Sequence, residues 1–307
     1  MSVLTRVQIV TVSTAPTHKY QKLQKQTTKQ WGYSYTSIAQ GVQWQGFVTK
    51  MVQAADYLKK ALLEDPSGTR ETLYAFVDAY DLVFTGPPEE LLAKYRNHDV
   101  PIVVGVERIC FGNCVPTTCE PVNTSGSVRQ FINGGCVIGR ADELATFYEW
   151  GARHYPADDQ IALSQYYSRH CGMIAKDTEA EIVLNLAAFT WKELDTLEMQ
   201  DGRLTLSKTG TQPCMVHCPF IFQDLGERWD FVLRETLPGY TPPHTTGQLF
   251  HSLVKHVTTL AQNNKSYFVF VLVLSYGSVL AVIALVIVCV LAFRAGSKAL
   301  VMYEHGH

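Results

Sequence analysis

The chain has 307 residues, of which 47% are hydrophobic and 18% are charged, and its formal net charge at pH 7 is −2. This length suits one large domain or two modest ones. The near-neutral charge and the lack of a basic stripe give no support to nucleic-acid binding, so we expect no nucleic-acid partner.

Strand and helix patterns alternate along the first part of the chain. The stretch VQIVTVS predicts an opening strand, and apolar residues at helical spacing predict a helix over residues 47–62. The breaker cluster DPSG ends that helix. We then expect a strand in LYAFV, a helix in PPEELLAKY and a strand in VPIVVGVE.

The same alternation continues after a polar, cysteine-containing loop near residues 110–127. The stretch FINGGCVIGR predicts a strand entered through an Asn-Gly-Gly turn. Two helices follow, one from Asp142 to about His154 and one in PADDQIALSQYYSRH. This order predicts an α/β domain over residues 1–240, with a Rossmann-type, mainly parallel sheet flanked by helices.

The C-terminal part has a different composition. Residues 266–293 contain no charged side chain. As a helix this run would span ~42 Å, more than the ~30 Å hydrocarbon core of a bilayer. We therefore expect a linker at 241–265, one transmembrane helix at 266–293 that contacts the lipid bilayer, and a short tail at 294–307.

These features predict a single-pass protein of the endomembrane system, in the ER or Golgi. The first apolar segment, of only about five residues, is too short for a signal peptide. Positive charges close to the span are balanced on its two sides, so the side on which the large domain lies stays open.

Two acids, Asp78 and Asp81, follow the apolar strand LYAFV. Buried carboxylates cost free energy unless something pairs with them. One interpretation is a structural turn that closes the strand. The other is a divalent-metal site, because open α/β sheets bind ligands at the carboxyl ends of their strands and Mg²⁺ or Mn²⁺ takes carboxylate oxygens while bridging substrate phosphates.

Five blocks in collinear order carry a family resemblance: VQIVTVSTA, FVDAYDLVFTGPPEELLAKY, GVERIC, FINGGCVIG and DDQ. From about residue 7 to 240 the chain resembles the glycosyltransferase domain of the procollagen lysyl hydroxylases, which is of the GT-A type and uses Mn²⁺ and a UDP-sugar. The resemblance implies a GT-A-like fold. It also implies transfer of a hexose from UDP-glucose or UDP-galactose to an acceptor hydroxyl on a protein or glycan, with Mn²⁺ or Mg²⁺ as cofactor.

The resemblance implies metal-binding and catalytic residues. Asp78 and Asp81 match the family's D-x-x-D metal pair, and His217 in CMVHCP matches its third metal ligand. Asp158 and Asp159 match the last acids of an Asp-rich helix start. Acids at this position also serve as helix caps; the functional interpretation is that one of them, Asp159 in the first place, faces the sugar or the acceptor hydroxyl as a catalytic residue.

It also implies residues that bind the donor. Trp44 is expected to pack against the uracil and Lys50 to lie near the diphosphate. On composition alone, Trp44 would be interpreted as a core residue and Lys50 as a solvated surface charge. Thr11 and Ser13, at the end of the first strand, are expected to contact the nucleotide. The predicted turn Asn133-Gly134-Gly135 resembles part of the family's sugar pocket.

One departure from the family keeps other hypotheses open. The segment HCPF replaces the small residues that follow the family's metal-binding histidine and approach the diphosphate. The second hypothesis is therefore a non-catalytic module that binds a nucleotide sugar or tethers a partner at the membrane. A third is a thiol or metal protein built on Cys110, Cys114 and Cys119. The acceptor is not inherited from the family.

Overall fold

The computed structural model describes residues 3–15, 19–108, 130–170, 172–186, 196–219, 232–237 and 239–240. All of them belong to one compact unit, Met1–Pro242. No helix within these described ranges is long and apolar enough to cross a membrane. The expected linker, transmembrane helix, tail and the loop with Cys110, Cys114 and Cys119 lie outside the described residues and stay predictions.

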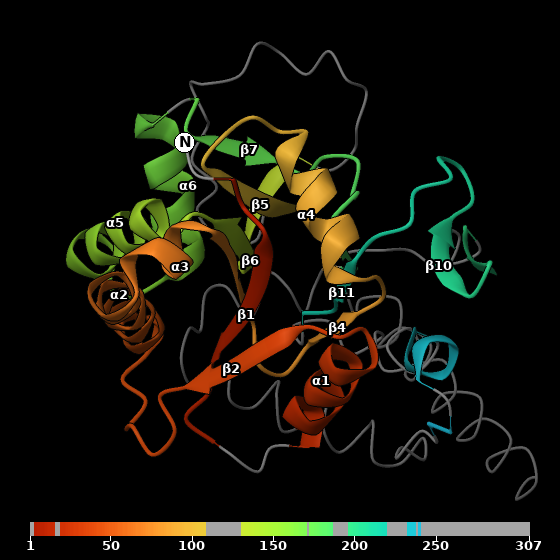
Figure 1. Cartoon of the computed structure of the whole chain (residues 1–307), viewed down its shortest axis with the longest axis horizontal. Coiled ribbons are helices and arrows are strands. Elements are labelled where there is room, and N and C mark those ends of the chain that lie inside the picture. Colours follow the sequence, from red (N-terminus) through yellow and green to blue (C-terminus); the bar gives the residue numbers. More distant parts are fainter. Residues whose placement is uncertain are drawn as a thin grey trace, which may run out of the picture. The chain divides into compact units, whose positions relative to one another are not determined.

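A six-stranded sheet in the order β2-β1-β3-β6-β5-β7 forms the centre of this unit (Figure 1). Its strands are β1 (Arg6–Val12), β2 (Ser34–Ile38), β3 (Thr72–Val77), β5 (Ile102–Glu107), β6 (Phe131–Gly139) and β7 (Ile174–Lys176). Three of the pairings, β1 with β2, β1 with β3 and β5 with β7, are parallel. Strand β6 runs antiparallel to both of its neighbours. The predicted α/β fold with a mainly parallel sheet is confirmed.

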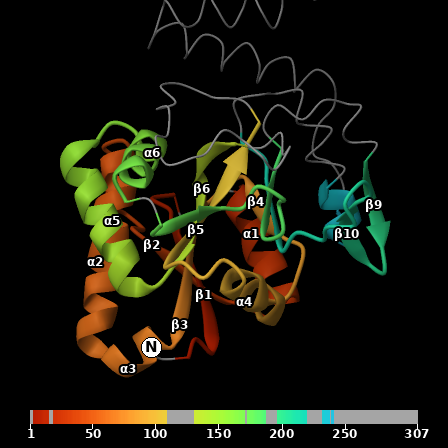
Figure 2. The same ribbon diagram turned by 90° about the horizontal axis from the view of Figure 1, so that it is seen from above.

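Helices cover both faces of this sheet. Figure 2 shows three helices on one side, α2 (Phe47–Glu64), α5 (Ala141–His154) and α6 (Asp159–Arg169). On the other side lie α1 (Lys19–Gln30) and α4 (Pro88–Arg96), while the short α3 (Pro66–Arg70) leads into β3. Because both faces are covered, every residue of β3 and of β5 is buried, without the alternation of a half-exposed strand.

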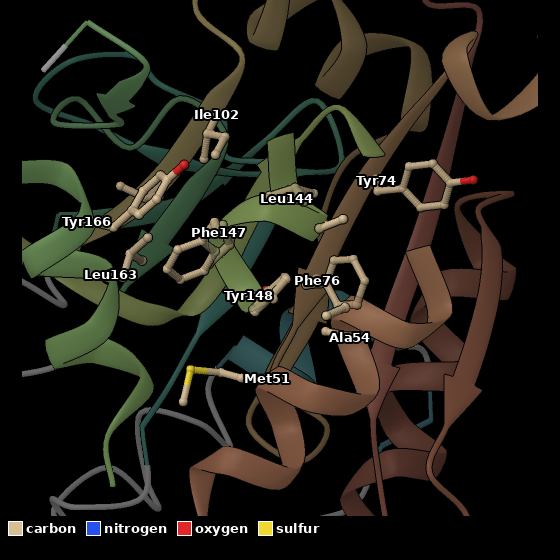
Figure 3. Close-up of a cluster of buried hydrophobic side chains, with 14 of the residues drawn as sticks. Met51, Ala54, Tyr74, Phe76, Ile102, Leu144, Phe147, Tyr148, Leu163 and Tyr166 are labelled. Carbon is tan, nitrogen blue, oxygen red and sulfur yellow. The ribbon is translucent and has the colours of Figure 1, made fainter. Parts of the chain in front are cut away.

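Alternate residues of each central strand enter two different cores. In β3, Tyr74 and Phe76 face α2 and α5, whereas Leu73 and Ala75 face the other layer. Figure 3 shows the first core, in which the ring of Phe76 lies 5.0 Å from that of Tyr148 on α5. This two-sided packing fixes the register of β3 and with it the position of the acids that follow.

A second, three-stranded sheet has the order β4-β11-β8. Its strands are β4 (Leu82–Phe84), β8 (Val183–Asn185) and β11 (Met215–His217), and a separate hairpin joins β9 (Leu197–Gln200) to β10 (Arg203–Leu206). Strand β11 is antiparallel to β4 and parallel to β8. Since β4 begins only a few residues after β3, this small sheet brings the distant β11 back to the end of the central sheet.

The prediction of an Asn-Gly-Gly turn is wrong. Asn133, Gly134 and Gly135 lie inside β6, which pairs with β5 both before and after them and with β3 after them. The β5–β6 register shifts between Val104 and Val106, and the Asn133 side chain accepts a hydrogen bond of 2.9 Å from the Gly135 N–H. An irregular strand therefore takes the place of the expected turn.

Candidate functional site

A cleft of about 670 Å³ opens at the edge of the central sheet where β1, β3 and β5 end. Strand β6 is antiparallel, so its first residues reach the same edge. The cleft is lined by Val12, Thr14, Trp44, Phe47, Lys50, Asp78, Ala79, Tyr80, Asp81, Glu107, Asn133, Gly134, Gly135, Asp158, Asp159, Gln160, His217 and Pro219. Most of the predicted site residues thus share one cavity, at the place where open α/β sheets bind ligands.

Asp78, Asp81 and His217 converge at the bottom of this cleft. One ligand atom from each lies within 4.8 Å of the others. The His217 Nε2 atom is 3.6 Å from Asp78 Oδ2 and 3.5 Å from Asp81 Oδ1. Asp78 follows β3, Asp81 precedes β4 and His217 ends β11, so the two sheets together assemble the group.

Burial and mutual attraction set the protonation of these three residues. Burial raises the pKa of Asp81, although His217 opposes the shift. Burial also acts to raise the pKa of Asp78, but Lys50 and His217 outweigh it and hold that pKa below its ordinary value. Burial would lower the pKa of His217, yet the facing carboxylates raise it. The group therefore favours a positive charge at its centre, from a proton or from a cation.

Two observations show that the residues suit a divalent cation. Asp81 Oδ1 and His217 Nε2 are both buried, and neither has a hydrogen-bond partner among the described residues. Two carboxylates and an imidazole are also the mixed oxygen and nitrogen ligands that ions such as Mn²⁺ accept. A cation between them would satisfy atoms that otherwise carry a desolvation cost.

The backbone of Gly135 lies against the imidazole ring. A Cβ atom at this position would approach His217 Cε1 to 2.2 Å and Nε2 to 2.6 Å. The Gly135 carbonyl also accepts a hydrogen bond of 2.9 Å from the Asp78 N–H. Only glycine allows β6 to run this close to the candidate metal-binding group, Asp78, Asp81 and His217.

Lys50 lies inside the cleft wall and not at a solvated surface. Its Nζ is 2.6 Å from Asp78 Oδ1 and 2.6 Å from Asp159 Oδ2, and it donates to the Gly134 carbonyl at 3.1 Å. Burial would lower the pKa of Lys50, but Asp159 and Asp78 hold it well above the ordinary value. Two carboxylates therefore already compensate the charge that was expected to face a diphosphate.

The two acids at the start of α6 have different surroundings. Asp158 is the N-cap residue, and its Oδ1 accepts a hydrogen bond of 2.9 Å from the Ile161 N–H. Asp159 is 7% exposed and pairs with Lys50. Burial raises the pKa of Asp159 even though Lys50 opposes the shift. Asp159 is therefore the acid that is linked to the candidate metal-binding group, through Lys50 and Asp78.

Neither of the residues whose hydroxyls are predicted to contact the nucleotide, Thr11 and Ser13, is part of the cleft lining. Thr11 is fully buried and donates a hydrogen bond of 2.9 Å to the Val77 carbonyl. The Ser13 hydroxyl lies 3.0 Å from that of Tyr80. The alternate residues Val12 and Thr14 line the cleft instead, as does Tyr80, the partner of Ser13.

Trp44 is at the mouth of the cleft and is 46% exposed. It packs edge to face on Phe47, with ring centroids 6.1 Å apart. The loop that carries it contains Gly41 and Gly46 at positive φ. The indole thus presents a free aromatic surface to a planar ligand.

Glu107 is a site residue that sequence reasoning did not single out. It ends β5, is 1% exposed and accepts hydrogen bonds of 3.1 Å from both Asn133 and Gln160. Gln160 in turn accepts from the Gly134 N–H at 3.2 Å. Burial raises the pKa of Glu107 to about 7, although Asn133, His217 and Gln160 oppose the shift. Its position, an acid at the end of the apolar run PIVVGVE, is the feature of the sequence from which it could have been predicted.

Known proteins resemble this chain over the region that forms the cleft. It is 26% identical over 217 residues to "Multifunctional procollagen lysine hydroxylase and glycosyltransferase LH3" of Rattus norvegicus and 27% identical over 217 residues to "Procollagen-lysine,2-oxoglutarate 5-dioxygenase 1" of Homo sapiens. Each match includes 68% of this chain and 29% of the relative, so the chain spans less than a third of these proteins.

A similar solved structure is titled "crystal structure of a glycosyltransferase involved in the glycosylation of the major capsid of PBCV-1", with 9% identity and a TM-score of 0.43 over 69% of this chain and 93% of that one. The family model described as "PLOD GT domain" matches residues 4–222. That range is more than half of the chain and contains every residue of the cleft, so the chain belongs to the PLOD GT domain family.

Proposed function

We propose that this chain is a metal-dependent glycosyltransferase that moves a hexose from UDP-glucose or UDP-galactose to an acceptor hydroxyl on a protein or glycan. The observation that carries the proposal is the convergence of Asp78, Asp81 and His217 in a cleft large enough for a small-molecule ligand. Membership of the PLOD GT domain family and the glycosyltransferase activity in the names of relatives support it.

The metal site, the exposed indole and the buried lysine of the cleft have separate tasks in this reaction. Asp78, Asp81 and His217 would hold Mn²⁺ or Mg²⁺, which when bound stabilises the negative charge of the departing diphosphate. Trp44 offers its exposed face to the nucleobase. Lys50 holds Asp78 and Asp159 in one arrangement, so that Asp159 is fixed beside the reacting region.

Glu107 is suited to hold a proton close to neutral pH. Its pKa of about 7 and its place in the cleft lining make it, with Asp159, a candidate to exchange a proton with the acceptor hydroxyl. Asn133 and Gln160 fix both of its carboxylate oxygens.

We further propose that residues 266–293 anchor the chain in an endomembrane bilayer. The length of this predominantly apolar run and its lack of any charged side chain support this proposal. A tag at Met1 in intact microsomes shows on which side of the membrane the large domain lies, since protection of the tag from protease indicates a lumenal domain and its digestion a cytosolic one. Extraction of the protein by alkaline carbonate would contradict the anchor.

The transferase proposal is tested with the full chain, purified in detergent, against a panel of UDP-sugars with Mn²⁺ while released UDP is measured. We expect turnover with one hexose donor and a loss of at least about 100-fold in Asp78→Ala. Donor binding without turnover, unchanged in Asp78→Ala, would instead favour the non-catalytic module that the altered HCPF segment leaves open.

A further inference from the structure

Asn185 lies behind His217, away from the two acids. Strands β8 and β11 run parallel with Asn185 opposite His217, and the Asn185 Nδ2 atom is 3.4 Å from His217 Nδ1. Asn185 is 1% exposed and is not among the described residues that line the cleft. It therefore does not line the cleft, and its contact with Nδ1 places it to act on the site through the imidazole.

A histidine that binds a cation through Nε2 needs its proton on Nδ1. A neutral imidazole has one N–H donor and one lone pair, and the hydrogen bond made by the second nitrogen decides which is which. Since Nε2 faces Asp78 and Asp81, a hydrogen-bond acceptor beside Nδ1 would stabilise the tautomer that binds a cation there. Asn185 is the residue opposite this atom, and its amide has both an acceptor oxygen and a donor nitrogen.

The ring itself has little freedom to adapt. Gly135 lies against it closely enough that even one added methyl group would collide. The amide nitrogen of Asn185 faces Nδ1 in the structure, which suits an Nε2–H directed at the carboxylates. A half-turn of the amide presents the oxygen instead and suits an Nε2 lone pair directed at a cation.

We propose that Asn185 is a positioning residue that selects the tautomer of His217, accepting the Nδ1 proton through its amide oxygen when Nε2 binds a divalent cation. This inference rests on the proposed function, because it assumes a cation at Asp78, Asp81 and His217. It predicts that the quality of the acceptor at position 185 sets metal affinity. Groups that orient metal-binding histidines typically contribute about 10- to 100-fold to affinity.

The test compares three variants of the full chain in detergent, with Mn²⁺ alone as the probe and free Mn²⁺ measured by electron paramagnetic resonance. Asn185→Leu has no acceptor, and we expect its Kd for Mn²⁺ to rise about 10- to 100-fold. Asn185→Asp keeps an acceptor, so its Kd for Mn²⁺ should be lower than that of the wild type or at most about threefold higher. Thr85→Val is the matched control, because Thr85 is equally buried, donates to the Pro213 carbonyl at 2.7 Å and directly follows β4 of the same sheet.

The melting temperature of each variant without Mn²⁺ separates folding from metal binding. Wild-type affinity in Asn185→Leu would overturn the inference. So would equal weakening in Asn185→Leu and Asn185→Asp, because any change at this position would then disturb the site. A wild-type chain that binds no Mn²⁺ would remove the proposed function itself, and the inference with it.

Discussion

Gly135 and His217 approach each other so closely that a Cβ on the glycine would lie 2.2 Å from the ring carbon Cε1. We expect Gly135→Ala to push the ring away from Asp78 and Asp81 and to weaken Mn²⁺ binding by at least about tenfold. Titration with Mn²⁺ checks this result. Gly139→Ala is the control, because Gly139 is in the same strand as Gly135. Its added Cβ would also be crowded, at 2.6 Å from the Pro101 carbonyl oxygen, but it would not meet His217. Similar Mn²⁺ affinities in the two variants would contradict the prediction.

The parts that the sequence predicts well are those encoded locally. Helix α2, strand β5 and helix α5 have clear apolar periods or runs, and the structure contains all three near their expected bounds. Asp78 and Asp81 could be recognised because two acids after a buried strand are unusual. His217 could be found only from the family resemblance, because 135 residues separate it from the next residue of the group.

The parts that the sequence did not reveal depend on distant partners. Helix α1 is polar and buries Gln24, which donates to the Asp78 carbonyl at 2.6 Å, so its apolar pattern is weak. The three-residue strands β4, β8 and β11 are specified only by pairing with one another. Lys50 was expected to face a diphosphate. The sequence does not reveal that Lys50 instead pairs with two acids, because one of them, Asp159, is 109 positions away.

Asp81 should be important for metal binding but should not stabilise the metal-free fold. Burial raises its pKa, and the neighbouring Asp78 adds to the shift, so the ionised form is unfavourable when no cation is bound. We expect Asp81→Asn to be as stable as the wild type or about 0.5–1 kcal/mol more stable without metal. It should also lose at least about 100-fold in Mn²⁺-dependent UDP release. Urea denaturation and a UDP assay on the same preparation measure both, and clear destabilisation without metal would contradict the prediction.

Lys50 should be important for folding as well as for the site. Lys50→Met removes the positively charged partner of both Asp159 and Asp78. The side chain of Asp159 is 10% exposed and that of Asp78 is 34% exposed. Removing one partner of a buried pair costs about 3–5 kcal/mol, and the partial exposure of Asp78 suggests the lower end. Urea denaturation measures the loss.

Lys59→Met is the matched control for this change. Lys59 is on the same helix and pairs with Glu149 at 2.8 Å, but both side chains are 46% exposed. An exposed pair of this kind contributes about 1 kcal/mol or less. Equal losses in Lys50→Met and Lys59→Met would show that the buried pairs of Lys50 add nothing beyond a surface ion pair.

Glu107 should make the unfolding free energy depend on pH. Its pKa rises from 4.5 to about 7 on folding, so the folded chain keeps a proton that the unfolded chain has lost. Stability should therefore fall as the pH rises from about 4.5 to about 7 and change no further above that, by on the order of 2–3 kcal/mol in total. Glu107→Gln should lack this fall, because Gln does not titrate. Denaturation of both proteins between pH 5 and pH 8 gives the difference in slope, and parallel curves would refute the assignment.

Trp44 should affect donor binding without affecting the fold. Its side chain is 46% exposed and its packing contact is Phe47, so Trp44→Ala should change the unfolding free energy by about 0.5 kcal/mol or less. Stacking of an aromatic side chain on a base contributes about 1–3 kcal/mol, so the KM for the active UDP-sugar should rise by roughly 5- to 150-fold. The kcat should change much less, because this contact is made equally in the ground state and the transition state.

Leu63→Ala is the control for this change. Leu63 is 83% exposed at the far end of α2, so its substitution should leave KM unchanged. An unchanged KM in Trp44→Ala would mean that the nucleobase binds elsewhere in the cleft.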